Sequence, residues 1–291
     1  EARIHNMVAD RHDWCISRQR VWGVPIPIFY CEDCNEHLVN DDTINAVADL
    51  FAKEGSDAWW AHSAEEILPQ GTKCPKCGGT HFRKESDIMD VWFDSGSSHA
   101  AVCKTRPELA WPADMYLEGS DQHRGWFQSS LLTAVGAFGQ GAPFKECVTH
   151  GWTVDGEGKA MHKSLGNGVD PADVFNENGA DILRLWAASA DYHADVRCSK
   201  EIFKQLSQNY LKFRNTCKFM LDNLVDFDPE KLTKPEDMPV LDRWLLTKLN
   251  ELIEKAEQSY CDYEFHIITH AVNDFCVNTL SSFYLDIVKD R

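Results

Sequence analysis

Short apolar runs and amphipathic segments alternate over the first two thirds of the chain. Apolar residues alternate over 24–30, interrupted by two prolines, which is typical of an edge or bulged strand. Short strands are also expected at 115–117 and 144–150, and apolar positions recur at helical spacing over 127–138 between them. Strands that alternate with helices in this way predict an α/β fold with a parallel sheet.

The pattern becomes purely helical after about residue 200. Apolar positions recur at near-helical spacing over 202–224 and 241–256, while the charged, proline-bearing stretch 226–240 predicts a linker. We therefore expect two domains. Residues 1–199 form the α/β part, with a polar insertion at about 31–82, and residues 200–291 form a helical bundle.

Composition narrows the class of protein. Apolar residues make up 43% of the 291 residues, which excludes a disordered chain, and the formal charge of −17 argues against a protein that coats nucleic acid. No apolar run approaches the roughly 18 residues of a membrane span, so no membrane partner is expected. Eleven cysteines, an odd number, indicate free and metal-bound thiols in a reducing cytoplasm better than a disulfide framework.

Two Cys-x-x-Cys pairs border the polar insertion. Cys31 and Cys34 form the first pair, and Cys74 and Cys77 form the second. Four thiolates in two such turns are the ligand set of a tetrahedral structural Zn²⁺, with no open position for chemistry. Unpaired cytosolic cysteines or a redox pair are the alternatives.

A polar segment follows the expected strand at 115–117 and leads into the expected helix. It holds Glu118, Gly119, Asp121 and Gln122, and it ends at Trp126. Ligands of open α/β sheets bind at the carboxyl ends of strands, where helix N-termini favour anions. A capped helix with a satisfied aspartate is the plainer alternative.

A second polar segment lies at 155–167. Lys163 stands on a glycine-flanked loop, beside Met161, His162 and Ser164. A lysine on such a loop suits a polyphosphate whose charge grows in a transition state. Taken alone, a solvated lysine loop explains the pattern as well.

Together these segments resemble class I aminoacyl-tRNA synthetases, and among them the isoleucine-specific branch. The resemblance rests on blocks in the family's order: DWCISRQRVWG (13–23), DVWFDSGSSHA (90–100), YLEGSDQHRGWFQSS (116–130), THGWTVDGEGKAMHKSLGN (149–167) and GADILRLW (179–186). It implies the second half of a Rossmann-like catalytic domain with a zinc-knuckle insertion. Residues 200–291 would then begin a helical anticodon-binding, tRNA-contacting domain.

The resemblance also implies an activity and its residues. ATP would activate isoleucine to isoleucyl-adenylate, with Mg²⁺ expected, and the product would pass to tRNA(Ile), in a full enzyme that is monomeric. In family terms, Trp92 and Trp126 flank the aliphatic side chain, and Lys163 contacts the ATP phosphates as the catalytic residue of the loop. The adenylate would contact Glu118, Gly119, Asp121, Gln122 and His150.

The chain departs from the family pattern in two respects. Ala160 and His162 replace the first lysine and the middle serine of the family's Lys-Met-Ser-Lys-Ser loop, and Lys159 stands one place early. The family's His-x-Gly-His segment and its editing domain are absent from the 291 residues. The sequence therefore predicts a fragment that begins after the editing insertion and forms no adenylate alone.

Three alternatives stay open at this point. Valine is the nearest competing amino acid within the synthetase family. Another nucleotidyl-transferring α/β enzyme with an inserted zinc knuckle is a second possibility. A zinc-bearing nucleic-acid-binding module with a helical tail is the third, although the acidic charge weighs against it.

Overall fold

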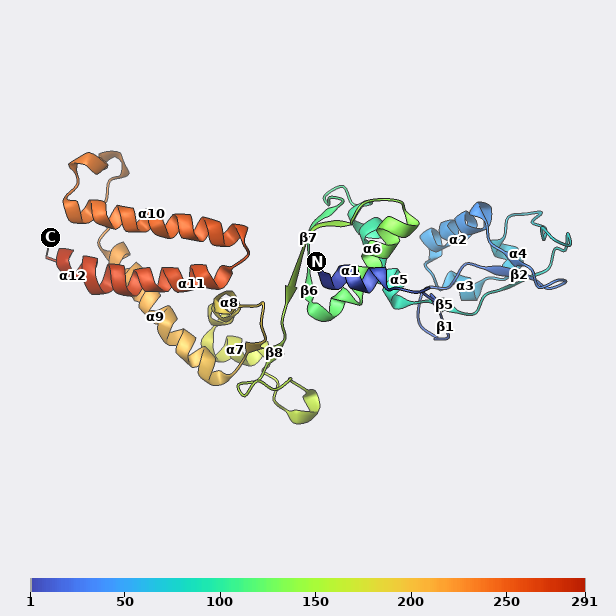
Figure 1. Cartoon of the computed structure of the whole chain (residues 1–291), viewed down its shortest axis with the longest axis horizontal. Helices are drawn as coiled ribbons and strands as arrows, with labels where there is room; N and C mark the ends of the chain where they lie inside the picture. The colour runs from blue at the N-terminus through green and yellow to red at the C-terminus, as the bar shows by residue number, and fades with distance from the viewer. Residues whose placement is uncertain (1, 291) are drawn as a thin grey trace. The chain divides into compact units, whose positions relative to one another are not determined.

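The computed structural model describes residues 2–290. The chain divides into two compact units, Glu1–Val148 and Thr149–Arg291 (Figure 1). Both units combine helices with short strands, and the last part of the second is helical. The predicted mixed α/β character and the helical C-terminal part are therefore confirmed.

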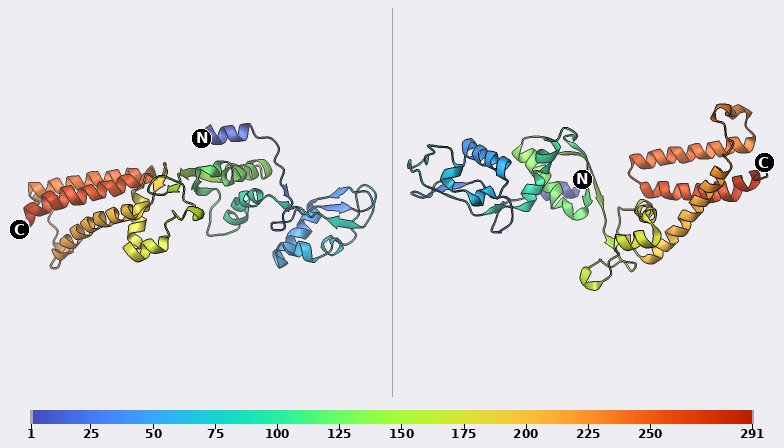
Figure 2. Two further views of the ribbon diagram at one scale, coloured as in Figure 1. Left: turned by 90° about the horizontal axis from the view of Figure 1, so that it is seen from below. Right: turned by 180° about the vertical axis from the view of Figure 1, so that it is seen from behind.

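Residues 29–84 form a small module around a three-stranded antiparallel sheet of order β3–β2–β4. Figure 2 shows helix α2 beside this sheet, and α2 begins at a capping box in which Asn40 and Thr43 exchange hydrogen bonds. Its core packs Phe29 and Trp59 together, both fully buried. The module contains β2 Phe29–Cys31, β3 His37–Leu38, α2 Asp41–Glu54, α3 Ala58–Ala61, α4 Ala64–Ile67 and β4 Phe82–Lys84.

The remainder of the first unit carries Trp92, Trp126 and the polar candidates at 118–122. Strands β1 and β5 pair antiparallel, and β6 pairs with β7. The N–H of Ala113 at the start of β6 donates to Pro143 just before β7 begins (2.9 Å), so these strands run in the same direction. The elements are α1 Ala2–Ala9, β1 Ser17–Arg18, β5 Ile88–Met89, α5 Val91–Gly96, a π-helical turn His99–Cys103, β6 Ala113–Gly119, a 3₁₀ turn Ser120–His123, α6 Trp126–Leu131, a π-helical continuation Leu132–Ala137 and β7 Phe144–His150.

The second unit begins with a small α/β portion. Helix α7 starts at the Asp170 cap with Pro171 at its first position, as predicted. A buried cluster that includes Val174, Ile182 and Phe203 joins α7, α8 and α9. The elements are β8 Thr153–Val154, a 3₁₀ turn Lys163–Leu165, α7 Pro171–Asn178, α8 Ala180–Ser189, β9 Val196–Arg197, which pairs parallel to β8, and α9 Lys200–Asp222.

Helices α10 and α11 follow the linker and lie side by side in both figures. The linker predicted at 226–240 contains only two 3₁₀ turns, Pro229–Lys231 and Pro235–Asp237. The helices are α10 Val240–Cys261, α11 Phe265–Asp274, a π-helical continuation Phe275–Tyr284 and α12 Leu285–Val288.

Two expectations need refinement. The strand expected over 24–30 is reduced to β2 from Phe29 and an isolated bridge between Pro25 and Ile88, because the prolines remove ladder donors. Within residues 2–290 the parallel strands form two separate pairs, β6 with β7 and β8 with β9, in place of one continuous sheet. No helix in this part of the chain is both long and apolar enough to cross a membrane.

Candidate functional site

The four cysteines of the two Cys-x-x-Cys pairs converge in the module of residues 29–84. Their sulfur atoms all lie within 4.8 Å of one another, and the Cys31–Cys77 and Cys34–Cys74 sulfurs are each 3.6 Å apart. A tetrahedral zinc with bonds of about 2.3 Å to sulfur needs sulfur atoms about 3.8 Å apart. The donor set and its spacing therefore fit a metal of this kind.

Local backbone groups favour a thiolate at one position of this cluster. Hydrogen bonds from the backbone of Cys77 and then Lys76 lower the pKa of Cys74 to about 6, whereas the neighbouring thiols Cys34 and Cys31 raise the pKa of Cys77 to about 12. Cys31 and Cys74 are also part of the apolar core of the module, beside Phe29 and Trp59. A metal bound to these cysteines would therefore crosslink residues of the module's apolar core.

The loop after β6 gathers the polar candidates of the first unit. Glu118 and Asp121 are exposed at the end of the strand and at the following 3₁₀ turn. The amide of Gln122 donates to Asp121 Oδ2 (3.2 Å), while its oxygen accepts the backbone N–H of Trp126 (3.0 Å). Gln122 thus links the exposed carboxylate to the first residue of α6.

The two candidate indoles both depend on helix α5. Trp92 is the second residue of α5 and remains 42% exposed. Trp126 donates its indole N–H to the carbonyl of Ser95 and to the hydroxyl of Ser98, both at 3.1 Å. A Cβ on Gly125 would lie 2.8 Å from the Trp92 ring, so this ring packs directly on the loop that carries Trp126.

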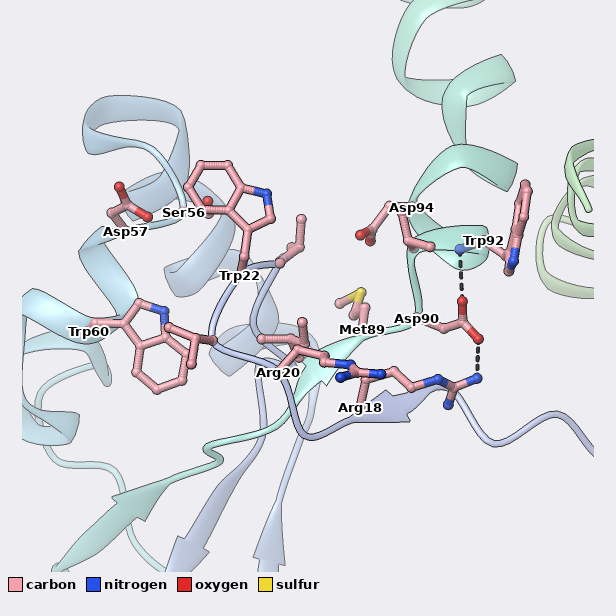
Figure 3. A pocket seen from close by; sticks show the side chains of 15 residues that line it. Arg18, Arg20, Trp22, Ser56, Asp57, Trp60, Met89, Asp90, Trp92 and Asp94 are labelled. Atoms are coloured by element: carbon pink, nitrogen blue, oxygen red, sulfur yellow. Dashed lines mark hydrogen bonds and ion pairs between the residues drawn. The ribbon is translucent and has the colours of Figure 1, made fainter. Parts of the chain in front are cut away.

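A pocket of about 710 Å³ lies beside the start of α5 (Figure 3). Its wall includes Trp92 and Asp90, and Asp90 points away from solvent with 4% of its surface exposed. The Asp90 carboxylate accepts the backbone N–H of Trp92 (2.8 Å), the indole N–H of Trp14 (3.2 Å) and the guanidinium of Arg18. The pocket also contains Arg20, Trp22 and Trp60.

The lysine loop belongs to the second unit. Met161 packs on the buried cluster of α7, α8 and α9, whereas His162, Lys163 and Ser164 are exposed. No acidic side chain forms an ion pair with Lys163 in the described part of the chain. Lys159, in contrast, pairs with the Glu157 carboxylate (2.7 Å).

Asn167 closes the lysine loop. Its oxygen accepts the backbone N–H of His162 (2.9 Å), and its amide donates to Asp155 Oδ2 (2.8 Å) and to the carbonyl of Ala160 (3.1 Å). The bond from Asn167, followed by the backbone N–H bond from Lys159, holds the pKa of Asp155 below its ordinary value. The loop therefore has a fixed base and an exposed tip.

The site candidates are divided between the two units. Those from Trp92 to Trp126 belong to the first unit, and His150 and the lysine loop belong to the second. His150 is the last residue of β7, and its Nδ1 lies 2.8 Å from the carbonyl of Gly151.

Sequence reasoning missed the roles of Asp90 and Asn167. An aspartate directly before a short apolar helix is a cap signal, which could have marked Asp90. Its bonds to Trp14 and Arg18 join residues far apart in the chain and leave no local pattern. Asn167 follows a glycine, as turn residues often do, but its three partners are not visible in the sequence.

Comparison with protein families gives two matches. The model of "tRNA synthetases class I (I, L, M and V)" matches residues 1–199, and that of "Anticodon-binding domain of tRNA ligase" matches residues 242–291. Among solved structures, the leucyl-tRNA synthetase of Agrobacterium radiobacter K84, in a ternary complex with tRNA and LeuAMS, is similar over 94% of this chain and 38% of its own. Its TM-score is 0.68 at 22% identity, which shows a shared fold.

Curated relatives match the chain from end to end. Isoleucine–tRNA ligase of Caldanaerobacter subterraneus subsp. tengcongensis is 64% identical, and that of Moorella thermoacetica is 61% identical. Each match covers 100% of this chain and 31% of the relative, so the chain spans about a third of the length of these relatives. With a family model matched over residues 1–199, the chain belongs to the class I tRNA synthetases of the isoleucine, leucine, methionine and valine group.

Proposed function

We propose that the chain is part of an isoleucine–tRNA ligase. Such an enzyme activates isoleucine with ATP and transfers the aminoacyl group to tRNA(Ile). The observation that carries the proposal is the identity of 64% and 61% to isoleucine–tRNA ligases across the whole chain. In the first step a carboxylate oxygen of isoleucine attacks the α-phosphorus of ATP, and pyrophosphate leaves. A ribose hydroxyl of tRNA then attacks the carbonyl carbon, and AMP leaves.

The first unit would supply the amino-acid contacts and all of the adenylate contacts except His150, which belongs to the second unit. Trp92 and Trp126 suit an aliphatic side chain because large aromatic surfaces bury apolar groups well. The proposed adenylate contacts are Glu118, Gly119, Asp121, Gln122 and His150. Most of these residues belong to the β6–α6–β7 unit, which would be part of the second half of a Rossmann-like nucleotide-binding domain.

Lys163 would act on the phosphates. Its ammonium is exposed and free of an acidic partner in the described part of the chain, which leaves its charge available to the departing pyrophosphate. Together with Lys163, the residues Met161, His162 and Ser164 would form the ATP loop. Mg²⁺, a usual companion of ATP phosphates, would neutralise further charge. Rate enhancement would then come from positioning and electrostatics, with no covalent enzyme intermediate.

The four-cysteine cluster would hold a structural Zn²⁺. Four thiolates fill a tetrahedral shell, so no position remains for a reacting group. Because the cluster lies in the core of residues 29–84, the metal would stabilise this zinc-knuckle insertion.

We assign residues 1–199 to the catalytic domain, with the insertion at about 31–82. Residues 200–291 would begin the helical domain that contacts tRNA, in keeping with the anticodon-binding match over 242–291. A monomeric enzyme in the cytoplasm completes the proposal.

Amino-acid-dependent exchange of pyrophosphate into ATP tests this function in the full-length enzyme. Isoleucine should give the highest kcat/KM, with valine second, and only tRNA(Ile) should be charged. Stronger exchange with valine, leucine or methionine would reassign the substrate. The 291-residue chain alone should give no exchange, since the family's His-x-Gly-His segment is absent from it.

A further inference from the structure

The proposed function gives no role to the segment DWCISRQR at residues 13–20, although Arg18 and Arg20 of this segment line the pocket in Figure 3. We propose that Asp90, held by Arg18 and Trp14 of this segment, is a positioning residue that fixes helix α5 and with it both indole walls of the isoleucine pocket. This inference rests on the proposed function, since it assumes that Trp92 and Trp126 contact the amino acid.

The Asp90 carboxylate is buried and fully engaged. One oxygen accepts the backbone N–H of Trp92 at 2.8 Å, and the other accepts the Trp14 indole N–H at 3.2 Å and the Arg18 guanidinium. A buried carboxylate is tolerated only when it is paired and hydrogen-bonded. Arg18 therefore supplies the positive charge beside the buried carboxylate of Asp90 at the start of α5.

The backbone restrains the same residue. Arg18 of β1 stands opposite Ile88 of β5 in the antiparallel pair, and the N–H of Asp90 donates to the carbonyl of Ile16 at 2.6 Å. Asp90 is thus bound to the segment through both its side chain and its main chain. In Figure 3 its carboxylate points toward Arg18 on one side and toward the first turn of α5 on the other.

Helix α5 in turn determines where both indoles stand. Trp92 is the second residue of the helix, and Trp126 donates to the carbonyl of Ser95 within it. The packing of α5 on α6 leaves little freedom, because a Cβ on Gly96 would lie 2.8 Å from the backbone of Ser129. A small rotation of α5 would therefore displace both walls together.

Such a displacement matters most for selection between isoleucine and valine. One methylene in an apolar pocket is worth only about 10- to 200-fold, a range for which isoleucine-against-valine selection by synthetases is itself an example. A misplacement of about 1 Å far from the chemistry can cost on the order of a hundredfold. Loss of the restraint on α5 should therefore affect the recognition of the amino acid more strongly than the recognition of ATP.

The test is Asp90→Asn in the full-length enzyme, followed by pyrophosphate exchange with isoleucine and with valine. Asparagine still caps the helix but gives Arg18 no anionic partner. We expect the KM for isoleucine to rise about tenfold and the isoleucine-to-valine ratio of kcat/KM to fall about tenfold, since a hydrogen bond to a charged group is lost. The KM for ATP should stay within about twofold.

Arg18 variants provide an independent measurement if Asp90→Asn does not fold. Arg18→Gln should reproduce its kinetics, and Arg18→Lys, which keeps the charge, should restore most of the discrimination. The double variant should be no worse than either single one, because the two side chains act as one unit. Asp114→Asn is the matched control. It removes an exposed carboxylate paired with Lys145 in the same unit. It should change neither the KM for isoleucine nor the isoleucine-to-valine ratio of kcat/KM.

The outcomes separate the two proposals. A wild-type enzyme without isoleucine-dependent exchange would overturn the proposed function itself. An active wild type whose Asp90 and Arg18 variants keep the isoleucine KM and the isoleucine-to-valine ratio would overturn the positioning role alone. An equal loss of activity with both amino acids, together with a lower Tm and no rescue by lysine, would reduce Asp90 to a purely structural residue and equally overturn it.

Discussion

The ring of Tyr116 stacks on the indole of Trp126, with the ring centroids 4.0 Å apart and the planes inclined by only 6°. Tyr116 lies on β6 with 3% of its surface exposed, whereas Trp126 opens α6. The strand therefore supports one face of the indole, while the edge of the indole is bonded to Ser95 and Ser98. The indole of Trp126 is therefore fixed both on one face and at its N–H edge.

Replacing Tyr116 by leucine should weaken isoleucine binding. The variant removes the stack beneath Trp126, and aromatic pairs of this kind contribute about 0.5–1.5 kcal/mol beyond their buried area. We expect a three- to tenfold rise in the KM for isoleucine, roughly that energy expressed as a ratio, measured by pyrophosphate exchange.

Tyr116→Phe is the matched control for this change. It keeps the ring and removes a buried hydroxyl that has no hydrogen-bond partner. Its KM should match the wild type, and its stability should be equal or slightly higher, because no hydrogen bond is lost. A KM that rises equally in the phenylalanine and leucine variants would contradict the stacking role.

Metal analysis of the purified protein should find about one zinc per chain. A strong chelator should then partly reduce the ellipticity, because the cluster lies inside the core of residues 29–84. Cys34→Ser should lower both the zinc content and the Tm. Cys15→Ser, at an exposed cysteine outside the cluster, should change neither. Protein free of zinc with an unchanged spectrum would show that the module of residues 29–84 folds without metal and would overturn the zinc site.

Local signals account for the parts of the fold that could be predicted. The cap and proline at Asp170 and Pro171 and the helical spacing after residue 200 are encoded in neighbouring residues, and the structure has these elements. The convergence of the four cysteines also followed from spacing alone.

The parts that escaped prediction depend on distant contacts. Strands β6 and β7 have seven residues each and are present where the sequence predicts strands, whereas β8 and β9 have only two residues each and carry too little alternation to be recognised. The bond between Arg18 and Asp90 joins positions 72 residues apart, and only the folded chain brings them together. The stacking of Tyr116 on Trp126 is likewise a packing contact that no sequence pattern predicts.

Acid should destabilise the first unit through His99. This ring is fully buried; its Nδ1 accepts the Trp111 indole N–H (3.1 Å), and its Nε2 lies 3.2 Å from the Thr133 hydroxyl. Burial, and secondarily the charge of Lys104, lowers the pKa of His99 below its ordinary value of 6.5. Between pH 6.5 and the lower pKa of the folded state, the unfolded chain therefore binds more protons than the folded one. The free energy of unfolding decreases as the pH is lowered through this range.

Urea unfolding of the full-length enzyme between about pH 5 and 7.5 measures this effect. His99→Gln should lose part of the acid-dependent decrease in stability, although the variant is less stable at neutral pH. The exposed His12→Gln serves as the control and should keep the wild-type slope. Equal slopes for all three proteins would count against a titration at His99.

Restoring the family lysine should strengthen the ATP loop. Ala160→Lys adds a positive charge three residues from Lys163, while the existing Lys159 is occupied by its ion pair with Glu157. We expect kcat of pyrophosphate exchange to rise about two- to fivefold, the scale of an exposed charge interaction, and the gain should shrink at high salt. Glu157→Gln, which frees Lys159, should give a smaller gain in the same direction. Unchanged kinetics in Ala160→Lys would show that this departure from the family pattern carries no cost.

Asn167 should control the rate of the chemical step without affecting the recognition of isoleucine. Its side chain bonds to His162, Ala160 and Asp155, so Asn167→Ala releases the base of the loop that presents Lys163. Because a charge stabilises a transition state only when it is held in place, we expect kcat to fall about tenfold while the KM for isoleucine stays within about twofold. Asn178→Ala, which loses a bond to Ser207 elsewhere in the same unit, is the control for general loosening. An equal loss of kcat in both variants would assign the effect to stability, whereas a selective loss in Asn167→Ala identifies the loop's fixed base as the element that holds Lys163 ready for the phosphates.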